Sequence, residues 1–148
     1  PTRRDLVIVT NHEGNAYFED LRAKTHFDKD QRIKFVGTVY DQNELRYIRE
    51  KAFAYLHGHE VGGTNPGLLE AMWSTPVNVV LGVHFNRTTA GDAVIYFDKD
   101  NLLTTLSAVE KLTKDERQVL QRKARQLIEE KYTWSHICDQ YEMLFSRY

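Results

Sequence analysis

Two hydrophobic patterns alternate along this chain. One pattern is the continuous apolar run, without alternation of apolar and polar residues. It is typical of strands buried on both faces of a parallel sheet. Such runs predict strands at Asp5–Thr10, Arg32–Val36, Ala52–His57, Val77–Leu81 and Ala93–Phe97. Helical spacing of apolar residues predicts helices at Asn15–His26, Gln42–Lys51, Pro66–Ser74, Asn101–Leu112, Lys114–Tyr132 and Ser135–Phe145, with a short helix or turn at His84–Ala90.

Helix-start residues support these boundaries. Asp41 and Asn65 each precede a predicted helix and can accept a backbone N–H as N-cap, and Pro66 suits the first helical position. Thr113 and Glu116 have the spacing of a capping box. The capping residues therefore predict where three of the helices begin.

The alternation of strands and helices implies right-handed β–α–β crossovers. We therefore expect an α/β fold with a Rossmann-like, doubly wound parallel sheet and a helical C-terminus. The 148 residues are enough for a single domain spanning residues 1–148. Ligands bind such sheets beyond the carboxyl ends of the strands. The loops predicted at that edge are Asn11–Gly14, Gly37–Asp41, Gly58–Asn65 and Gly82–Asn86.

The loop Gly58–Asn65 and the helix after it indicate a binding site. The loop holds three glycines and leads into a helix N-terminus, where backbone N–H groups and the helix dipole attract anions. Glu70 lies among apolar residues in that helix, and its side chain should lean over Pro66 and Gly67, where the glycine leaves open space. We expect Glu70 to hydrogen-bond a ligand hydroxyl; the alternative is an exposed glutamate stabilised by the dipole.

Composition narrows the class of protein. The chain is 41% hydrophobic and 28% charged, as ordinary globular proteins are, and its net charge of −1 argues against nucleic acid as a partner. Its one cysteine, Cys138, cannot form a disulfide within the chain. The sequence shows no signal peptide, transmembrane segment or lipidation motif, so we expect a cytoplasmic protein.

Several segments resemble glycosyltransferase family 4. Its donor-binding segment usually reads E-G-F-G-L-x-x-L-E-A-M-A-x-G-x-P-V-V, which is similar to GGTNPGLLEAMW followed by STPVNVV here. RIKFVGTVYDQNEL, AGDAVIYFDKDNLLTTL and YTWSHICDQYEMLF resemble further segments of the family. The last of these resembles its closing helix, in which Trp134 and Tyr141 should anchor packing. The string HGHEVGGTNPGLLEAM is similar to one in bacterial capsule and cell-wall rhamnosyltransferases.

The resemblance implies the donor-binding half of an enzyme with two Rossmann-like domains (the GT-B fold). That half normally opens with a strand and a loop whose Arg and Lys contact the donor diphosphate. Neither has a counterpart before Asp5, so the chain resembles a fragment truncated at its N-terminus.

The implied reaction belongs to polysaccharide biosynthesis. It transfers a sugar with retention from a nucleotide sugar, here dTDP-rhamnose, to a saccharide or lipid-linked saccharide acceptor. The missing N-terminal domain would bind that acceptor, and the resemblance implies no metal or other cofactor. The full-length enzyme would act in the cytoplasm, at the inner face of the membrane.

The family's site residues carry over by position. Of its two glutamates spaced E-x7-E, the second contacts ribose and matches Glu70. The first contacts the transferred sugar and falls on Gly62, a departure for which Glu60 is the available substitute. The backbone N–H groups that would cradle diphosphate or sugar oxygens are those of Gly63, Thr64 and Asn65.

Further candidates lie in the turns at the same predicted edge. Val39 and Asp41 match the turn that lines the nucleobase pocket, and an N-cap is the alternative role for Asp41. His57 is expected to pack near the pocket, with His59 as a donor contact. The H-x-H spacing of these histidines beside Glu60 is common by chance, so we expect no metal there.

Two other functions remain open. One is a nucleotide-sugar epimerase of the same architecture, which needs further acid–base residues. The other is a non-catalytic nucleotide or sugar-phosphate binding module that acts through protein contacts. For the transferase, we expect the isolated chain to be inactive without the acceptor domain and the Arg/Lys loop.

Overall fold

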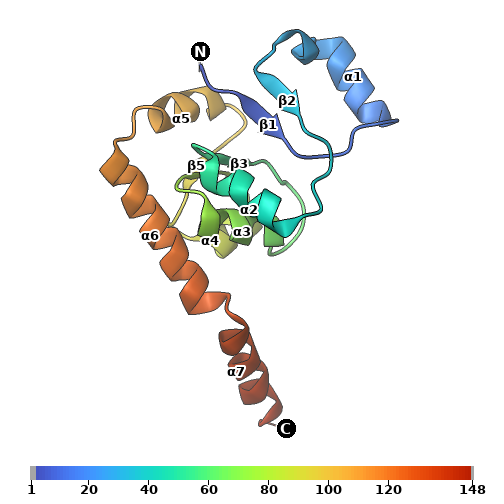
Figure 1. Ribbon diagram of the computed structural model, residues 1–148. Helices are drawn as coiled ribbons and strands as arrows, with labels where there is room; N and C mark the ends of the chain where they lie inside the picture. Colours follow the sequence, from blue (N-terminus) through green and yellow to red (C-terminus); the bar gives the residue numbers. More distant parts are fainter. Residues whose placement is uncertain (1–2, 148) are drawn as a thin grey trace. The chain divides into compact units, whose positions relative to one another are not determined.

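The computed structural model describes residues 3–147. Its contacts divide into two compact units, Pro1–Leu45 and Arg46–Tyr148, and each contains a small parallel sheet with helices (Figure 1). The α/β class and the parallel strands are thereby confirmed. The strands pair as two separate sheets, so the single doubly wound sheet and the GT-B half stay predictions, as does the single domain.

All of the predicted elements are present. They are β1 (Leu6–Ile8), α1 (Ala16–Thr25), β2 (Ile33–Phe35), α2 (Gln42–Lys51), β3 (Tyr55–His57), α3 (Pro66–Ser74), β4 (Asn78–Leu81), α4 (His84–Ala90), β5 (Ile95–Phe97), α5 (Leu102–Val109), α6 (Lys114–Lys131) and α7 (Trp134–Phe145). A short 3-10 helix, η1 (Phe27–Lys29), was not expected. Every strand is shorter than its apolar run, because a ladder extends only as far as a neighbouring strand runs beside it.

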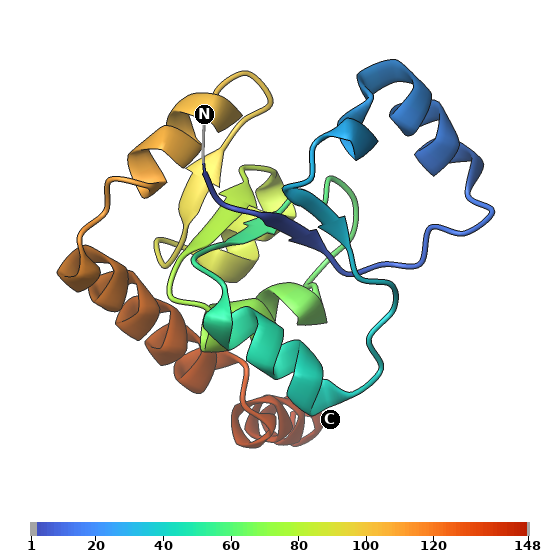
Figure 2. The same ribbon diagram turned by 45° about the horizontal axis from the view of Figure 1, so that its top comes forward.

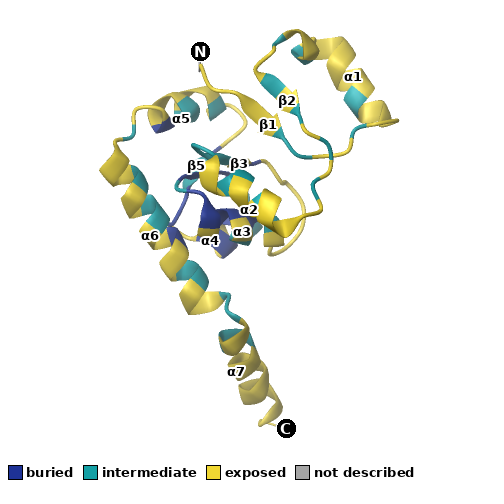
Figure 3. Ribbon diagram, viewed as in Figure 1, coloured by how far each residue is buried: buried dark blue, intermediate teal, exposed yellow. Residues whose placement is uncertain are grey.

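The Pro1–Leu45 unit has a small aromatic core. β1 and β2 pair in parallel. The core rings belong to His12, Phe18, Phe27 and Phe35, with neighbouring centroids 4.3 to 5.4 Å apart. No described residue of this unit is classed as buried (Figure 3). Leu6 and Val7 of β1 are 44% and 45% exposed, although their sequence is that of a buried strand.

The Arg46–Tyr148 unit is built on a parallel sheet in the order β3-β4-β5. All four residues of the central strand β4 are buried. Because side chains alternate along a strand, Val80 packs with Leu68, Met72 and Ala124. Val79, on the opposite face, joins a second cluster to which α5 contributes. α6 lies against α3, so helices cover both faces of this sheet (Figure 2).

The helix ends confirm the capping predictions. The Asn65 side chain accepts a hydrogen bond from the backbone N–H of Leu68 at 3.3 Å, with Pro66 as the first helical residue. Thr113 and Glu116 form the capping box reciprocally. The expected packing role of two aromatic residues in α7 is wrong, because Trp134 and Tyr141 are 85% and 57% exposed. Figure 3 shows α7 as mostly exposed along its length.

The helices of residues 3–147 include none with both the length and the apolar character needed to cross a bilayer. The longest, α6, has 18 residues but alternates acidic and basic side chains along its length. An apolar stretch of about 20 residues is the usual requirement for a membrane-spanning helix.

We predict that Leu68→Ala lowers the free energy of unfolding by about 2–5 kcal/mol, because it leaves a cavity between β4, α3 and α6. Leu103→Ala is the matched control: Leu103 also lies in a helix but is 80% exposed, so its loss should change stability by less than about 0.5 kcal/mol. Urea denaturation followed by circular dichroism measures both. Equal losses in the two variants would contradict this description of the core.

Candidate functional site

The candidate site lies where β3 ends and α3 begins. Between them, Gly62, Gly63 and Thr64 are exposed, which leaves their backbone accessible to a ligand. Gly62 has φ of 137°, a conformation that favours glycine. In the first turn of α3, Pro66 has no N–H and the N–H groups of Leu68 and Leu69 donate to Asn65, which leaves that of Gly67 at the positive end of the helix. This arrangement can hold an anion or hydrogen-bond a polyhydroxylated ligand.

Glu70 is held by an arginine that the sequence analysis did not identify. Its Oε2 lies 2.8 Å from Nη1 of Arg49, and the two side chains are 48% and 17% exposed. The carbonyl of Arg49 accepts a hydrogen bond from Oγ1 of Thr75 at 3.0 Å, which ties the end of α2 to the end of α3. Glu70 is therefore a fixed carboxylate with one face open to solvent.

The expected open space above Gly67 is wrong. A Cβ at Gly67 would meet Oδ1 of Asn65 at 3.1 Å and Oη of Tyr55 at 3.9 Å. The cap of α3 and a side chain of β3 therefore occupy that position. The ion pair to Arg49 therefore contributes to the orientation of Glu70, in addition to the lean of helical side chains from which that orientation was predicted.

His57 is an almost fully buried polar side chain at the candidate site. It is 2% exposed, and its ring stacks on that of His59 with centroids 5.0 Å apart. Oη of Tyr55 lies 3.5 Å from Nδ1 of His57. Burial, and secondarily the charge of His59, lower the pKa of His57 from 6.5 to about 4. His57 is the last residue of β3 and is buried, its packing near a ligand pocket stays a prediction, and its imidazole is neutral at pH 7.

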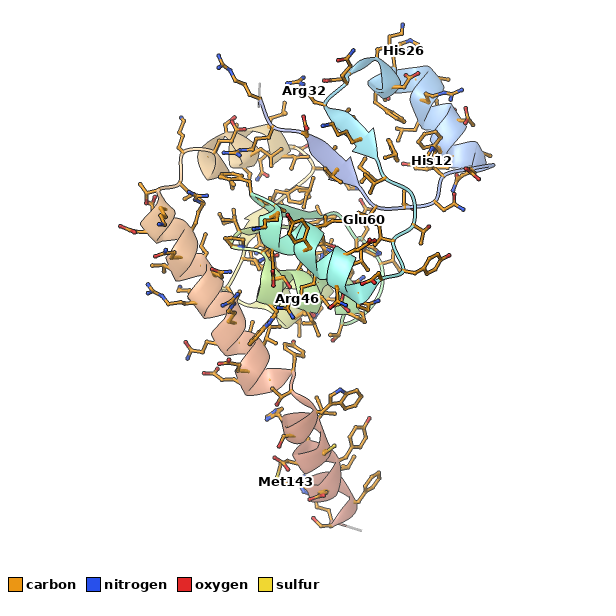
Figure 4. The ribbon with its side chains drawn as sticks, in the orientation of Figure 1. His12, His26, Arg32, Arg46, Glu60 and Met143 are labelled. Carbon is orange, nitrogen blue, oxygen red and sulfur yellow. The ribbon has the colours of Figure 1, made fainter. Side chains whose placement is uncertain are left out.

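Two other contacts fix the loop after β3. Nδ2 of Asn86, a fully buried residue of α4, donates to the carbonyl of His59 at 3.1 Å and to that of Leu81 at 2.9 Å. Glu60 forms an ion pair with Lys99 at 2.6 Å. Figure 4 labels Glu60 near β3. Lys99 thus partners the carboxylate that is available as a substitute for the missing sugar-facing glutamate, and that role of Glu60 stays a prediction.

The predicted site residues divide between the two units. Val39 and Asp41 belong to Pro1–Leu45, and all the others belong to Arg46–Tyr148. Asp41 caps the following helix: its Oδ1 accepts from the backbone N–H of Asn43 at 2.7 Å and of Glu44 at 3.2 Å. This confirms the alternative role given to Asp41, and its place in a nucleobase pocket stays a prediction, like that of Val39.

No cluster of three or more His, Cys, Asp or Glu side chains is arranged to hold a metal ion in the described part of the chain. At the H-x-H sequence, the His57 and His59 rings stack on each other and Glu60 pairs with Lys99.

We predict that acid destabilises the chain through His57. Unfolded, His57 takes up a proton near pH 6.5; folded, it resists protonation until about pH 4. Stability is therefore retained above pH 6.5 and falls as the pH drops from 6.5 to 4, by up to about 3 kcal/mol from this residue. Urea unfolding at pH 7 and pH 4.5 should show a smaller acid loss for His57→Gln than for the wild type, and identical losses would refute the prediction.

The comparisons leave the family unassigned. No family model and no curated protein matches the chain. Membership of glycosyltransferase family 4 therefore stays a prediction from the segments quoted above. The geometry at the β3–α3 junction is the basis on which a function can be proposed.

Proposed function

We propose that this chain is the donor-binding part of a retaining glycosyltransferase that uses a nucleotide sugar. One observation carries the proposal. The exposed glycine-containing loop leads from the carboxyl end of a parallel strand into the N-terminus of α3, with Glu70 fixed a short way inside that helix. A diphosphate and a ribose are the chemical groups that an N-terminal anion site and a nearby carboxylate suit.

Each group at the junction has a separate task in this proposal. Backbone N–H groups of Gly63, Thr64 and Asn65 hold the diphosphate, and they stabilise the charge that develops on it as the sugar departs. Glu70 accepts a hydrogen bond from the 3′-hydroxyl of the nucleotide's sugar, the one ring hydroxyl that a deoxyribose such as that of dTDP carries. Arg49 keeps that carboxylate in one orientation, so the ligand finds a preorganised acceptor.

The donor sugar is the less constrained part of the proposal. Gly62 occupies the position where the resembled family has a sugar-facing carboxylate, and Glu60 is paired with Lys99. A sugar that lacks a hydroxyl at the usual contact would tolerate that loss. We therefore assign a 6-deoxy sugar, dTDP-rhamnose, as the donor, with a saccharide acceptor bound by a separate domain.

We predict that dTDP, dTDP-rhamnose and UDP, added at millimolar concentration, shift the amide NMR signals of residues 62–65. Glu70→Gln should weaken binding of each nucleotide by about tenfold or more, because a hydrogen bond to a charged acceptor is lost. Glu130→Gln is the matched control, since Glu130 is an exposed glutamate of α6 outside the site.

Two results would refute the proposal. One is the absence of shifts at residues 62–65 in a folded sample. The other is equal weakening of nucleotide binding in the Glu70 and Glu130 variants, which would mean that the nucleotide does not bind at the β3–α3 junction. Weaker binding of UDP than of dTDP would support the thymidine nucleotide.

A further inference from the structure

The Nε2 atom of His57 has no hydrogen-bond partner, although the side chain is only 2% exposed. Buried polar atoms in folded proteins nearly always have a partner, and each exception calls for an explanation. None of the roles assigned above uses this nitrogen. His57 is the last residue of β3, so it lies directly before the loop of the candidate site.

The position of the imidazole relative to α3 follows from its neighbour on the same strand face. Tyr55 and His57 point to one side of the sheet because side chains alternate along a strand. Oη of Tyr55 lies 3.5 Å from Nδ1 of His57 and 3.9 Å from the Cβ position of Gly67. The imidazole is therefore on the face that carries the first turn of α3.

The same contact is compatible with a proton on either ring nitrogen, because the Tyr55 hydroxyl can donate to Nδ1 or accept from it. Burial raises the pKa of Tyr55, so its hydroxyl stays protonated and can donate to Nδ1. A neutral imidazole that accepts at Nδ1 has its proton on Nε2. In that tautomer, the unpartnered atom is an N–H donor on the face that carries the start of α3.

We infer that His57 is a ligand-binding residue whose Nε2–H donates a hydrogen bond to a diphosphate oxygen of the nucleotide held at the N-terminus of α3. The inference rests on the proposed function and adds a residue to its site. Nε2 is covered by protein, so the contact requires the loop after β3 to shift when the nucleotide enters. The loop residues 58–64 are all exposed, which leaves them room to do so.

The experiment compares the wild type with His57→Phe and His57→Gln. Phe fills the ring volume without a donor, and Gln retains an N–H near the position of Nε2. Amide NMR titration with dTDP and dTDP-rhamnose should show about tenfold weaker binding of both to His57→Phe and binding closer to the wild type in His57→Gln. Near-ultraviolet circular dichroism checks that both variants are folded.

A nitrogen-15 spectrum of the histidine rings tests the inference separately. It should show the Nε2–H tautomer for His57 and a shift of that signal when dTDP is added, with His136 of α7 as an internal control. A proton on Nδ1 would overturn the inference, as would unchanged dTDP binding by folded His57→Phe and His57→Gln.

The remaining outcomes separate the inference from the proposed function. A loss confined to dTDP-rhamnose would overturn the assignment to the diphosphate and point to the sugar. If the wild type binds and the His57 variants bind equally, only the inference fails. If the wild type binds neither nucleotide, both fail.

Discussion

β4 is the strand on which the Arg46–Tyr148 unit depends. It pairs with β3 on one edge and β5 on the other, and all four of its residues are buried. A parallel strand of this kind must be covered on both faces, because its side chains alternate between them. Val80 is covered by α3 and α6, and Val79 by the cluster to which α5 contributes. The positions of these helices follow from that requirement.

The candidate site is a consequence of the same constraint. Once α3 must cover β4, the chain has only residues 58–65 in which to pass from the end of β3 to the start of α3. The turn needs the unusual backbone of Gly62, and Asn65 caps only part of the helix end. Within the first turn of α3, the N–H of Gly67 is the one left beside the exposed loop. Packing of the core thus places a glycine-containing loop and a helix N-terminus together at the edge of the sheet.

Polar side chains from distant segments hold the loop and the side chains at that edge in place. Arg49 orients Glu70, Asn86 holds the carbonyl of His59, and Lys99 pairs with Glu60. Burial keeps His57 neutral and leaves its Nε2 without a partner, as it also leaves Oδ1 of Asn86. Buried polar atoms without a hydrogen-bond partner are found most often at functional sites. His57 therefore bears both on the stability of the chain and on the proposed ligand contact.

The sequence by itself determined the α/β class, the order of strands and helices and the caps at Asp41, Asn65 and Thr113. These depend on residues close together in the chain, so apolar spacing and capping chemistry are sufficient. Only the tertiary structure decided that Arg49 pairs with Glu70, that Asn65 and Tyr55 fill the space above Gly67, and that Trp134 is exposed. These contacts join side chains that are far apart in the sequence. The periodicity of apolar residues shows which face of a helix or strand is buried, but it does not show which other element packs against that face.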